Sequence, residues 1–213
     1  MEPLNRKNGE GVNIFVLSSS LYVSFQLFAN ILSTKIALLP IIHMSIDGGT
    51  VIYPLTFTLR DFVHKTHGKK DARQVIIIAA ALNAVMFGLF WLVGKMTPDP
   101  TWQFQTAYQQ ILLPVGRIVL ASIIAQVISE LMDTEIFSFV YKKTTDTLAV
   151  LASNSISLVV DSVVFCLIAF FGALPFSTVL AIIFTNILVK FIISTLSVPT
   201  IKLIPRTAKF EEI

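Results

Sequence analysis

Six stretches of this chain are apolar and long enough to cross a lipid bilayer as helices. A transmembrane helix needs about 20 mainly apolar residues, since the hydrocarbon core is about 30 Å thick. With 54% apolar and 14% charged residues, the chain leaves no room for a separate soluble domain. The sequence predicts an all-α integral membrane protein that forms a single transmembrane domain over residues 1–213. Its expected spans are residues 13–34, 50–66, 75–95, 111–139, 148–172 and 177–201.

The second stretch has the weakest apolar signal, because charged and polar residues crowd its end. Glycines mark both of its boundaries, and we expect chain breaks there. The crowding residues are Arg60, Asp61, His64 and Lys65, and the breaks are expected at Asp47-Gly48-Gly49 and at Gly68.

Basic residues are distributed unevenly over the predicted loops. The two ends and the even-numbered loops hold eleven lysines and arginines, whereas the odd-numbered loops hold only Lys35 and Lys95. Loops rich in lysine and arginine stay on the cytoplasmic side. Both termini are therefore expected in the cytoplasm, which requires an even number of spans. The net charge of +3 then reflects membrane topology, and no aromatic residues interleave with these basic ones to form a nucleic-acid surface.

Two copies of one polar pattern lie 28 residues apart in the fourth and fifth stretches. Each copy falls on one helical face at about 100° per residue. Consecutive helices are antiparallel, so residues equidistant from the connecting turn should lie at similar depth. This pairs Asp133 with Asn154 and Gln126 with Asp161, and each pair offers donors and acceptors to a flat polar ligand. The copies are Gln126-x2-Ser129-x3-Asp133-x3-Phe137 and Asn154-x2-Ser157-x3-Asp161-x3-Phe165.

Polar stripes on the first and sixth stretches complete a predicted polar interior. A charged residue at mid-membrane costs about 2.5–3.5 kcal/mol, so these groups should face one another or an aqueous cavity. A substrate or ion pathway and simple pairing between helices both explain them. Lys190 is a candidate countercharge for the aspartates. The stripes are Ser19, Tyr22, Gln26, Asn30 and Ser33 in the first stretch, and Asn186, Lys190, Ser194 and Ser197 in the sixth.

Two further polar residues have less certain positions. The third stretch, with Asn83 as its main polar residue, is expected to be peripheral. Arg117 lies away from the stripe of its own helix and near its outer end, so it faces either the cavity or the membrane interface.

Metal, cofactor and catalytic signatures are weak in this sequence. Asp61-x2-His64-x2-His67 lacks the i, i+4 spacing of a zinc site, and we predict no metal and no cofactor. The single Cys166 lies in mid-helix and is expected to pack in the interior. Carboxylates without a nucleophile or metal constellation argue against an enzyme.

Several of these motifs together resemble the queuosine-precursor transporter family, also called the vitamin uptake transporter family. The resemblance covers most of the chain, although Ser129-Glu130 and Leu158-Val159 stand where the family often has Gly-Gln or Gly-Asn. The motifs are the run from Tyr53 to Lys65 with Gly68 and Ala72-Arg73, Arg117-x3-Ala121-Ser122 with Asp133 and Phe137, Asp161-Ser162-x2-Phe165, and Lys190 with Ser194 and Pro199.

The resemblance implies import of a 7-deazaguanine across the bacterial inner membrane for tRNA modification, the substrate being 7-cyano-7-deazaguanine or its aminomethyl relative. Aspartates would accept the N–H groups of the base, cationic or amide groups would bind its carbonyl, and phenylalanines would stack on the ring. A vitamin-binding subunit of an energy-coupling-factor importer and, third, a membrane-embedded enzyme are the alternatives, and a homo-oligomer is possible. The candidate substrate-binding residues are Gln26, Asn30, Asp61, Arg117, Ser122, Gln126, Asp133, Phe137, Asn154, Asp161, Phe165 and Lys190.

Overall fold

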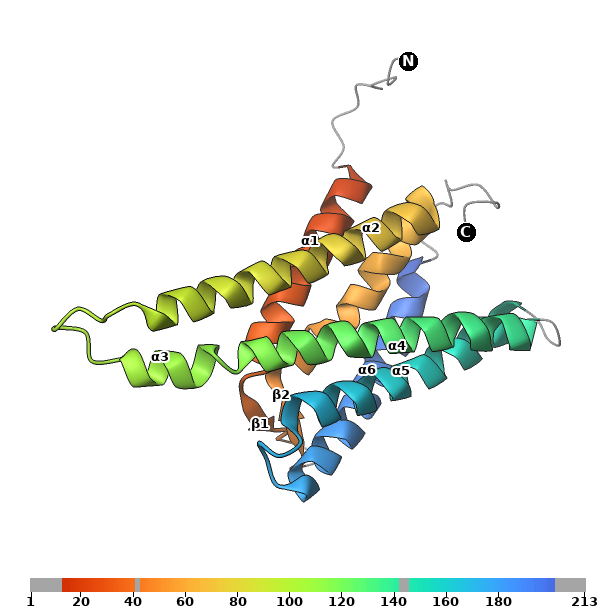
Figure 1. The fold of residues 1–213 in the computed structure, drawn as a ribbon. Coiled ribbons are helices and arrows are strands. Elements are labelled where there is room, and N and C mark those ends of the chain that lie inside the picture. The colour runs from red at the N-terminus through yellow and green to blue at the C-terminus, as the bar shows by residue number, and fades with distance from the viewer. Residues whose placement is uncertain (1–12, 41–42, 142–145, 202–213) are drawn as a thin grey trace, which may run out of the picture.

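Helices make up most of the computed structural model, which describes residues 13–40, 43–141 and 146–201. In Figure 1, α4 and α5 lie side by side, and α1 packs against α2. The side chain of Asn13 caps the start of α1 by accepting hydrogen bonds from the backbone of Phe15 and Val16. The elements are α1 (Ile14–Leu32), β1 (Ile36–Leu38), β2 (Ser45–Asp47), the 3-10 helix η1 (Gly48–Val51), α2 (Tyr53–Lys95), α3 (Gln105–Leu112), α4 (Val115–Tyr141), α5 (Asp146–Phe170) and α6 (Phe176–Ile201).

Helix α2 unites the second and third stretches that the sequence predicts as separate spans. Gly68 interrupts it with φ 88° and ψ 174°, a backbone conformation that essentially only glycine adopts. The expected break at Gly68 is therefore present, but as a bend without a connecting loop. The two arms of α2 run in different directions on either side of it (Figure 1).

A short antiparallel strand pair follows α1, and the sequence did not predict it. Ile36 pairs with Asp47 and Leu38 pairs with Ser45. Strands of three residues are too short to show the alternation of apolar and polar residues by which strands are recognised from sequence. The pair leads directly into η1 and α2, and β2 packs against α6, so the pair positions Asp47 beside that helix.

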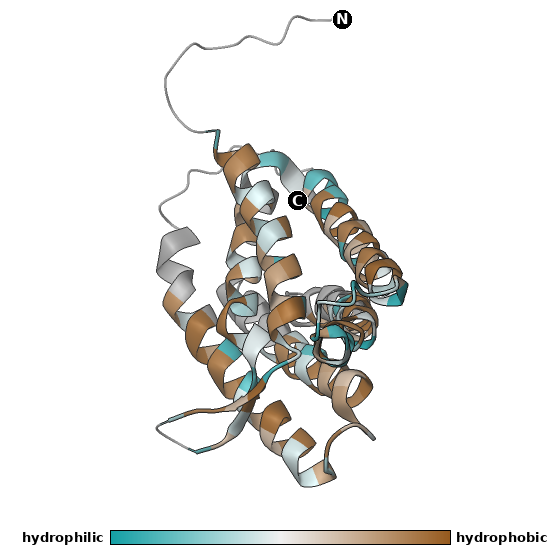
Figure 2. Ribbon diagram, turned by 90° about the vertical axis from the view of Figure 1, so that its left-hand side faces the viewer, coloured by the Kyte–Doolittle hydropathy of each residue, from teal (hydrophilic) through white to brown (hydrophobic). Residues whose placement is uncertain are grey.

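The helices have the lengths and composition of membrane spans. Four segments within the described residues are long and apolar enough to cross a bilayer: 14–32, 70–95, 105–129 and 176–193. The apolar stretch 155–170 of α5 is shorter. Figure 2 shows hydrophobic residues along the greater part of these helices. The structure is mostly helical and its helices suit a membrane, as predicted, while the count of six spans and the cytoplasmic termini stay predictions.

Two apolar clusters hold the helices together. One joins α4, α5 and α6 through residues such as Ile118, Phe170 and Ile182, and it includes the buried Cys166. The other joins α1 to both arms of α2 through Tyr22, Val63 and Val75 among others. Cys166 thus packs in the interior, as its position in mid-helix predicts.

Candidate functional site

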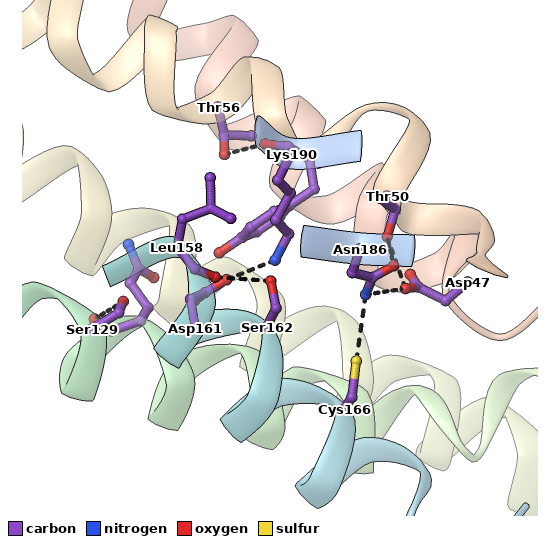
Figure 3. Close-up of polar contacts among 12 residues, drawn as sticks. Asp47, Thr50, Thr56, Ser129, Leu158, Asp161, Ser162, Cys166, Asn186 and Lys190 are labelled. Carbon is purple, nitrogen blue, oxygen red and sulfur yellow. Dashed lines mark hydrogen bonds and ion pairs between the residues drawn. The ribbon is translucent and has the colours of Figure 1, made fainter. Parts of the chain in front are cut away.

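A buried ion pair links α5 to α6. The ammonium of Lys190 donates to Asp161 Oδ2 at 2.8 Å, and each side chain is 3% exposed. The same ammonium lies 4.7 Å from the ring centroid of Tyr53 at the start of α2, a cation–π contact. Figure 3 shows Lys190 pointing toward Asp161 from the facing helix. The two residues that the sequence marks as opposite charges are therefore in direct contact.

A second buried carboxylate, Asp47, is held entirely by neutral groups. Its Oδ1 accepts hydrogen bonds from Thr50 and Asn186 at 2.8 Å each, and its Oδ2 accepts one from Ser33 at 2.7 Å. Thr50 also approaches Asn186 Oδ1 at 2.6 Å, and the amide of Asn186 reaches Cys166 Sγ at 3.4 Å. Figure 3 shows Asn186 between Asp47 and Cys166. This network joins α1, β2, η1, α5 and α6.

Amide side chains extend the polar interior into α1, α2 and α4. Asn30 donates to Asn83 Oδ1 at 2.7 Å, and Asn83 donates to the Ala79 carbonyl at 2.9 Å. Gln26 and Gln126 both donate to the hydroxyl of Tyr22, at 3.3 and 3.0 Å. Buried amides with partners of this kind specify how helices pack in a membrane.

Two small cavities adjoin these networks. The first has a volume of about 20 Å³ and the second about 10 Å³, close to the space of one water molecule each. Tyr53 and Asp161 border both cavities and therefore stand between them. The remaining lining of the first includes Asn30, Asp47, Ser122, Phe165, Asn186 and Lys190, and that of the second includes Tyr22, Gln26, Phe57, Arg60, Gln126 and Ser129.

Three polar groups on the first cavity lack a hydrogen-bond partner among the described residues. Asp161 Oδ1 is buried and unpaired, although Oδ2 of the same carboxylate bonds to Lys190. Asn30 uses its amide nitrogen on Asn83, which leaves its carbonyl oxygen unpaired. The hydroxyl of the buried Ser122 is also unpaired. Of the three, Asp161 Oδ1 is the fully buried unpaired atom, and since buried polar groups are nearly always satisfied, this cavity is the candidate ligand site.

The structure brings seven of the twelve candidate residues to these two cavities. Gln126 and Asp161 border the same cavity, as the antiparallel pairing of the two motifs predicts. The second predicted layer, Asp133 with Asn154, lies outside the described side chains, and so do Asp61 and Phe137. The seven are Gln26, Asn30, Ser122, Gln126, Asp161, Phe165 and Lys190.

Arg117 lies apart from the cavities. It is exposed, and it donates through Nε to the Ile168 carbonyl at 2.6 Å and through Nη2 to the Phe171 carbonyl. These carbonyls belong to the C-terminal end of α5, where a positive charge is favourable. The sequence left open whether Arg117 faces the cavity or the membrane interface. In the structure, Arg117 does not line either of the two cavities.

Several residues of the site were not among the candidates, and Asp47, Thr50 and Tyr53 were also absent from the predicted polar stripes. Asp47 precedes two glycines and has the sequence of an ordinary turn, so nothing local signals its burial. Thr50 and Tyr53 become site residues because η1 and the start of α2 pack beside α6. The expectation that the third stretch is peripheral was wrong at Asn83, which is 3% exposed and bonded to Asn30.

Comparison with known proteins decides the family. Residues 47–204 match the family described as "Putative vitamin uptake transporter". The chain belongs to the vitamin uptake transporter family. The resemblance predicted from the motifs is thereby confirmed, and the protein is a multi-pass membrane transporter of this family.

One curated relative makes the comparison more specific. The "Probable queuosine precursor transporter" of Bacillus subtilis (strain 168) is 26% identical to this vitamin uptake transporter over 157 residues, which are 71% of this chain and 68% of the relative. No solved structure matches the chain.

Proposed function

We propose that this transporter imports a queuosine precursor of the 7-deazaguanine class, 7-cyano-7-deazaguanine or 7-aminomethyl-7-deazaguanine, across the bacterial inner membrane. The name of the Bacillus relative, a probable queuosine precursor transporter, supports the substrate class. The observation that carries the proposal for the site is Asp161, a carboxylate 2% exposed with one unpaired oxygen on both cavities.

The chemistry of the first cavity suits the edge of a guanine-like base. Such an edge presents N–H donors, and Asp161 Oδ1 and the Asn30 carbonyl are two unpaired acceptors. The hydroxyl of Ser122 can donate or accept. The rings of Phe165 and Tyr53, which also line this cavity, provide apolar surfaces for the base. A ligand without these donors would leave buried acceptors unpaired, and this penalty gives selectivity.

The small volume of both cavities means that the substrate cannot occupy either without rearrangement. A bicyclic base is several times larger than the space of each cavity, which is about that of one water molecule. We therefore assign the structure to an occluded conformation, in which the ion pair and Tyr53 close the path. Transport then requires α5 and α6 to separate enough to admit the base at Asp161.

The proposed topology places the cavities in series across the membrane. With six spans and both termini in the cytoplasm, the end of α1 and the start of α2 face the outside. The first cavity includes Ser33 and Tyr53 from these ends, whereas the second includes Tyr22 and Arg60 from deeper turns. A substrate would pass from the first cavity to the second through the partition at Asp161, a form of alternating access.

A cell assay tests the function. A strain that cannot make the precursor is supplied with 7-cyano-7-deazaguanine, and queuosine in its tRNA is measured with and without this protein. We expect queuosine only when the protein is present. Equal amounts in both strains, with no second carrier encoded, would refute the proposal.

A matched serine pair tests the site. Ser122→Ala removes the unpaired hydroxyl on the first cavity, and we expect uptake to fall by about two- to tenfold, since one lost hydrogen bond to substrate is worth about 0.5–1.5 kcal/mol. Ser18→Ala is the control, because Ser18 is buried in α1 but bonds only to backbone carbonyls of its own helix. Equal uptake by both variants at equal membrane abundance would reject the assignment of Ser122.

A further inference from the structure

The first cavity carries more negative than positive charge. Asp47 and Asp161 are 1% and 2% exposed, and Lys190 is the cation that borders them. Lys190 bonds to Asp161, while Asp47 contacts no cation within the described residues. With both carboxylates ionised, the two aspartates and the one ammonium that line this cavity among the described residues have a net charge of one negative unit. A buried charge without a partner is strongly unfavourable, which indicates that a positive species is missing from this set.

The groups around Asp47 are oxygen donors suited to a cation. The hydroxyl of Ser33 donates to the carboxylate, and the single hydroxyl proton of Thr50 lies within reach of both Asp47 Oδ1 and the Asn186 carbonyl. Each hydroxyl oxygen also has lone pairs. The Asn186 carbonyl lies against Thr50, and the unpaired Asn30 carbonyl borders the same cavity. No histidine lines this cavity within the described residues, and Cys166 lies outside its lining. A donor set of oxygens alone selects hard cations over zinc or copper.

The backbone around this cavity adds to the negative potential. Asn30 and Ser33 lie at the C-terminal end of α1, where the helix dipole is negative. Gly49 packs so closely on the Ala29 carbonyl and the Ser33 hydroxyl that a Cβ would collide with both. The tight approach keeps these oxygens around a space of about 20 Å³, which is the size of one water molecule or a bare monovalent ion.

We propose that a monovalent cation of the size of sodium binds between Asp47, Ser33 and Thr50, with the carbonyl oxygen of Asn186. A monovalent cation would neutralise the single excess negative charge of the cavity, whereas a divalent cation would give the cavity a net positive charge. Magnesium would also retain several waters, for which the cavity has no room. The unpaired Asp161 Oδ1 on the same cavity is independent support, since it shows a buried acceptor facing an incomplete set of partners.

This site is connected to the proposed substrate site through α6. Asn186 and Lys190 are four residues apart and therefore lie on one face of that helix. Asn186 bonds to Asp47, and Lys190 bonds to Asp161. An ion at Asp47 would fix the position of Asn186 and, with it, the turn that carries Lys190. The inference that ion binding is coupled to import rests on the proposed function. The inference that the ion binds here does not depend on it.

Sodium binding to the purified full-length protein tests the proposal without any substrate. Radioactive sodium binding and thermal unfolding are measured in sodium chloride against choline chloride at equal ionic strength. We expect saturable binding and a higher unfolding temperature in sodium. Asp47→Asn and Thr50→Val should each weaken the affinity at least about tenfold, as loss of groups around a metal does.

Thr185→Val is the matched control for Thr50→Val. Thr185 is fully buried in α6, but its hydroxyl donates only to the Ala181 carbonyl, so this variant should retain wild-type affinity. No saturable sodium binding by the wild type, equal stabilisation by choline, or unchanged affinity in Thr50→Val would overturn the cation site. Deazapurine binding is also measured in choline chloride, without sodium. Its result tests only the proposed function, so a failure of the cation site can be told from a failure of the proposed function.

Discussion

At the scale of single residues, the distribution of buried charge explains most of the site. Asp161 and Lys190 could be predicted from sequence, because charged residues inside apolar helices need partners. Asp47 could not be predicted, since its main partner Asn186 lies 139 residues away. A carboxylate before two glycines is indistinguishable from a surface turn until that packing is known.

The ion pair gives a stability prediction. Asp161→Asn or Lys190→Met alone leaves the other charge buried without its partner, and each should destabilise the protein by about 3–5 kcal/mol. The double variant removes both charges and should recover much of that loss. Thermal unfolding of the four proteins in detergent measures the coupling. Additive effects of the two substitutions would show that the pair contributes nothing specific.

At the scale of elements, the apolar pattern predicted where helices lie better than how they join. The ranges of α1, α4, α5 and α6 follow the expected stretches closely. The break at Gly68 was predicted, but a single glycine does not reveal whether a loop or only a bend joins the two helices. The strand pair was not predicted. Asn83 shows the same limit, since a single polar residue in an apolar stretch does not reveal which neighbour it faces.

Two glycines of α2 offer a matched test of the bend. Gly68 has the backbone conformation that disfavours side chains, and Gly68→Ala should cost about 1–3 kcal/mol. Gly88 lies in the same helix, and a Cβ there would meet no atom within 4 Å, so Gly88→Ala should be neutral or stabilising by up to about 1 kcal/mol. The unfolding temperatures of both variants measure this difference in stability. Equal temperatures would show that the bend is not constrained at Gly68.

At the scale of the whole molecule, the proposal depends on the orientation of the chain in the membrane. The excess of lysine and arginine in the even-numbered loops predicts a cytoplasmic bend of α2 and an external loop between α2 and α3. The protein fold alone does not distinguish the two sides of a bilayer. Orientation therefore rests on the loop charges, which act during insertion.

Cysteine labelling in intact cells checks this orientation. In a Cys166→Ser background, a cysteine replacing the exposed Asp99 should react with an impermeant thiol reagent added outside. A cysteine replacing the exposed Lys70, near the bend of α2, should react only after the cells are permeabilised. The reverse pattern would invert the order of the two cavities and the direction of the path.

Substrate exchange in liposomes tests whether the chain carries a deazapurine at all. Purified protein is reconstituted into liposomes loaded with unlabelled 7-cyano-7-deazaguanine, and entry of the labelled compound is followed without any ion gradient, so that no driving force is assumed. We predict saturable exchange that excess unlabelled compound blocks, that adenine does not block, and that Asp161→Asn abolishes. Exchange no faster than in protein-free liposomes would show that this protein does not transport the precursor.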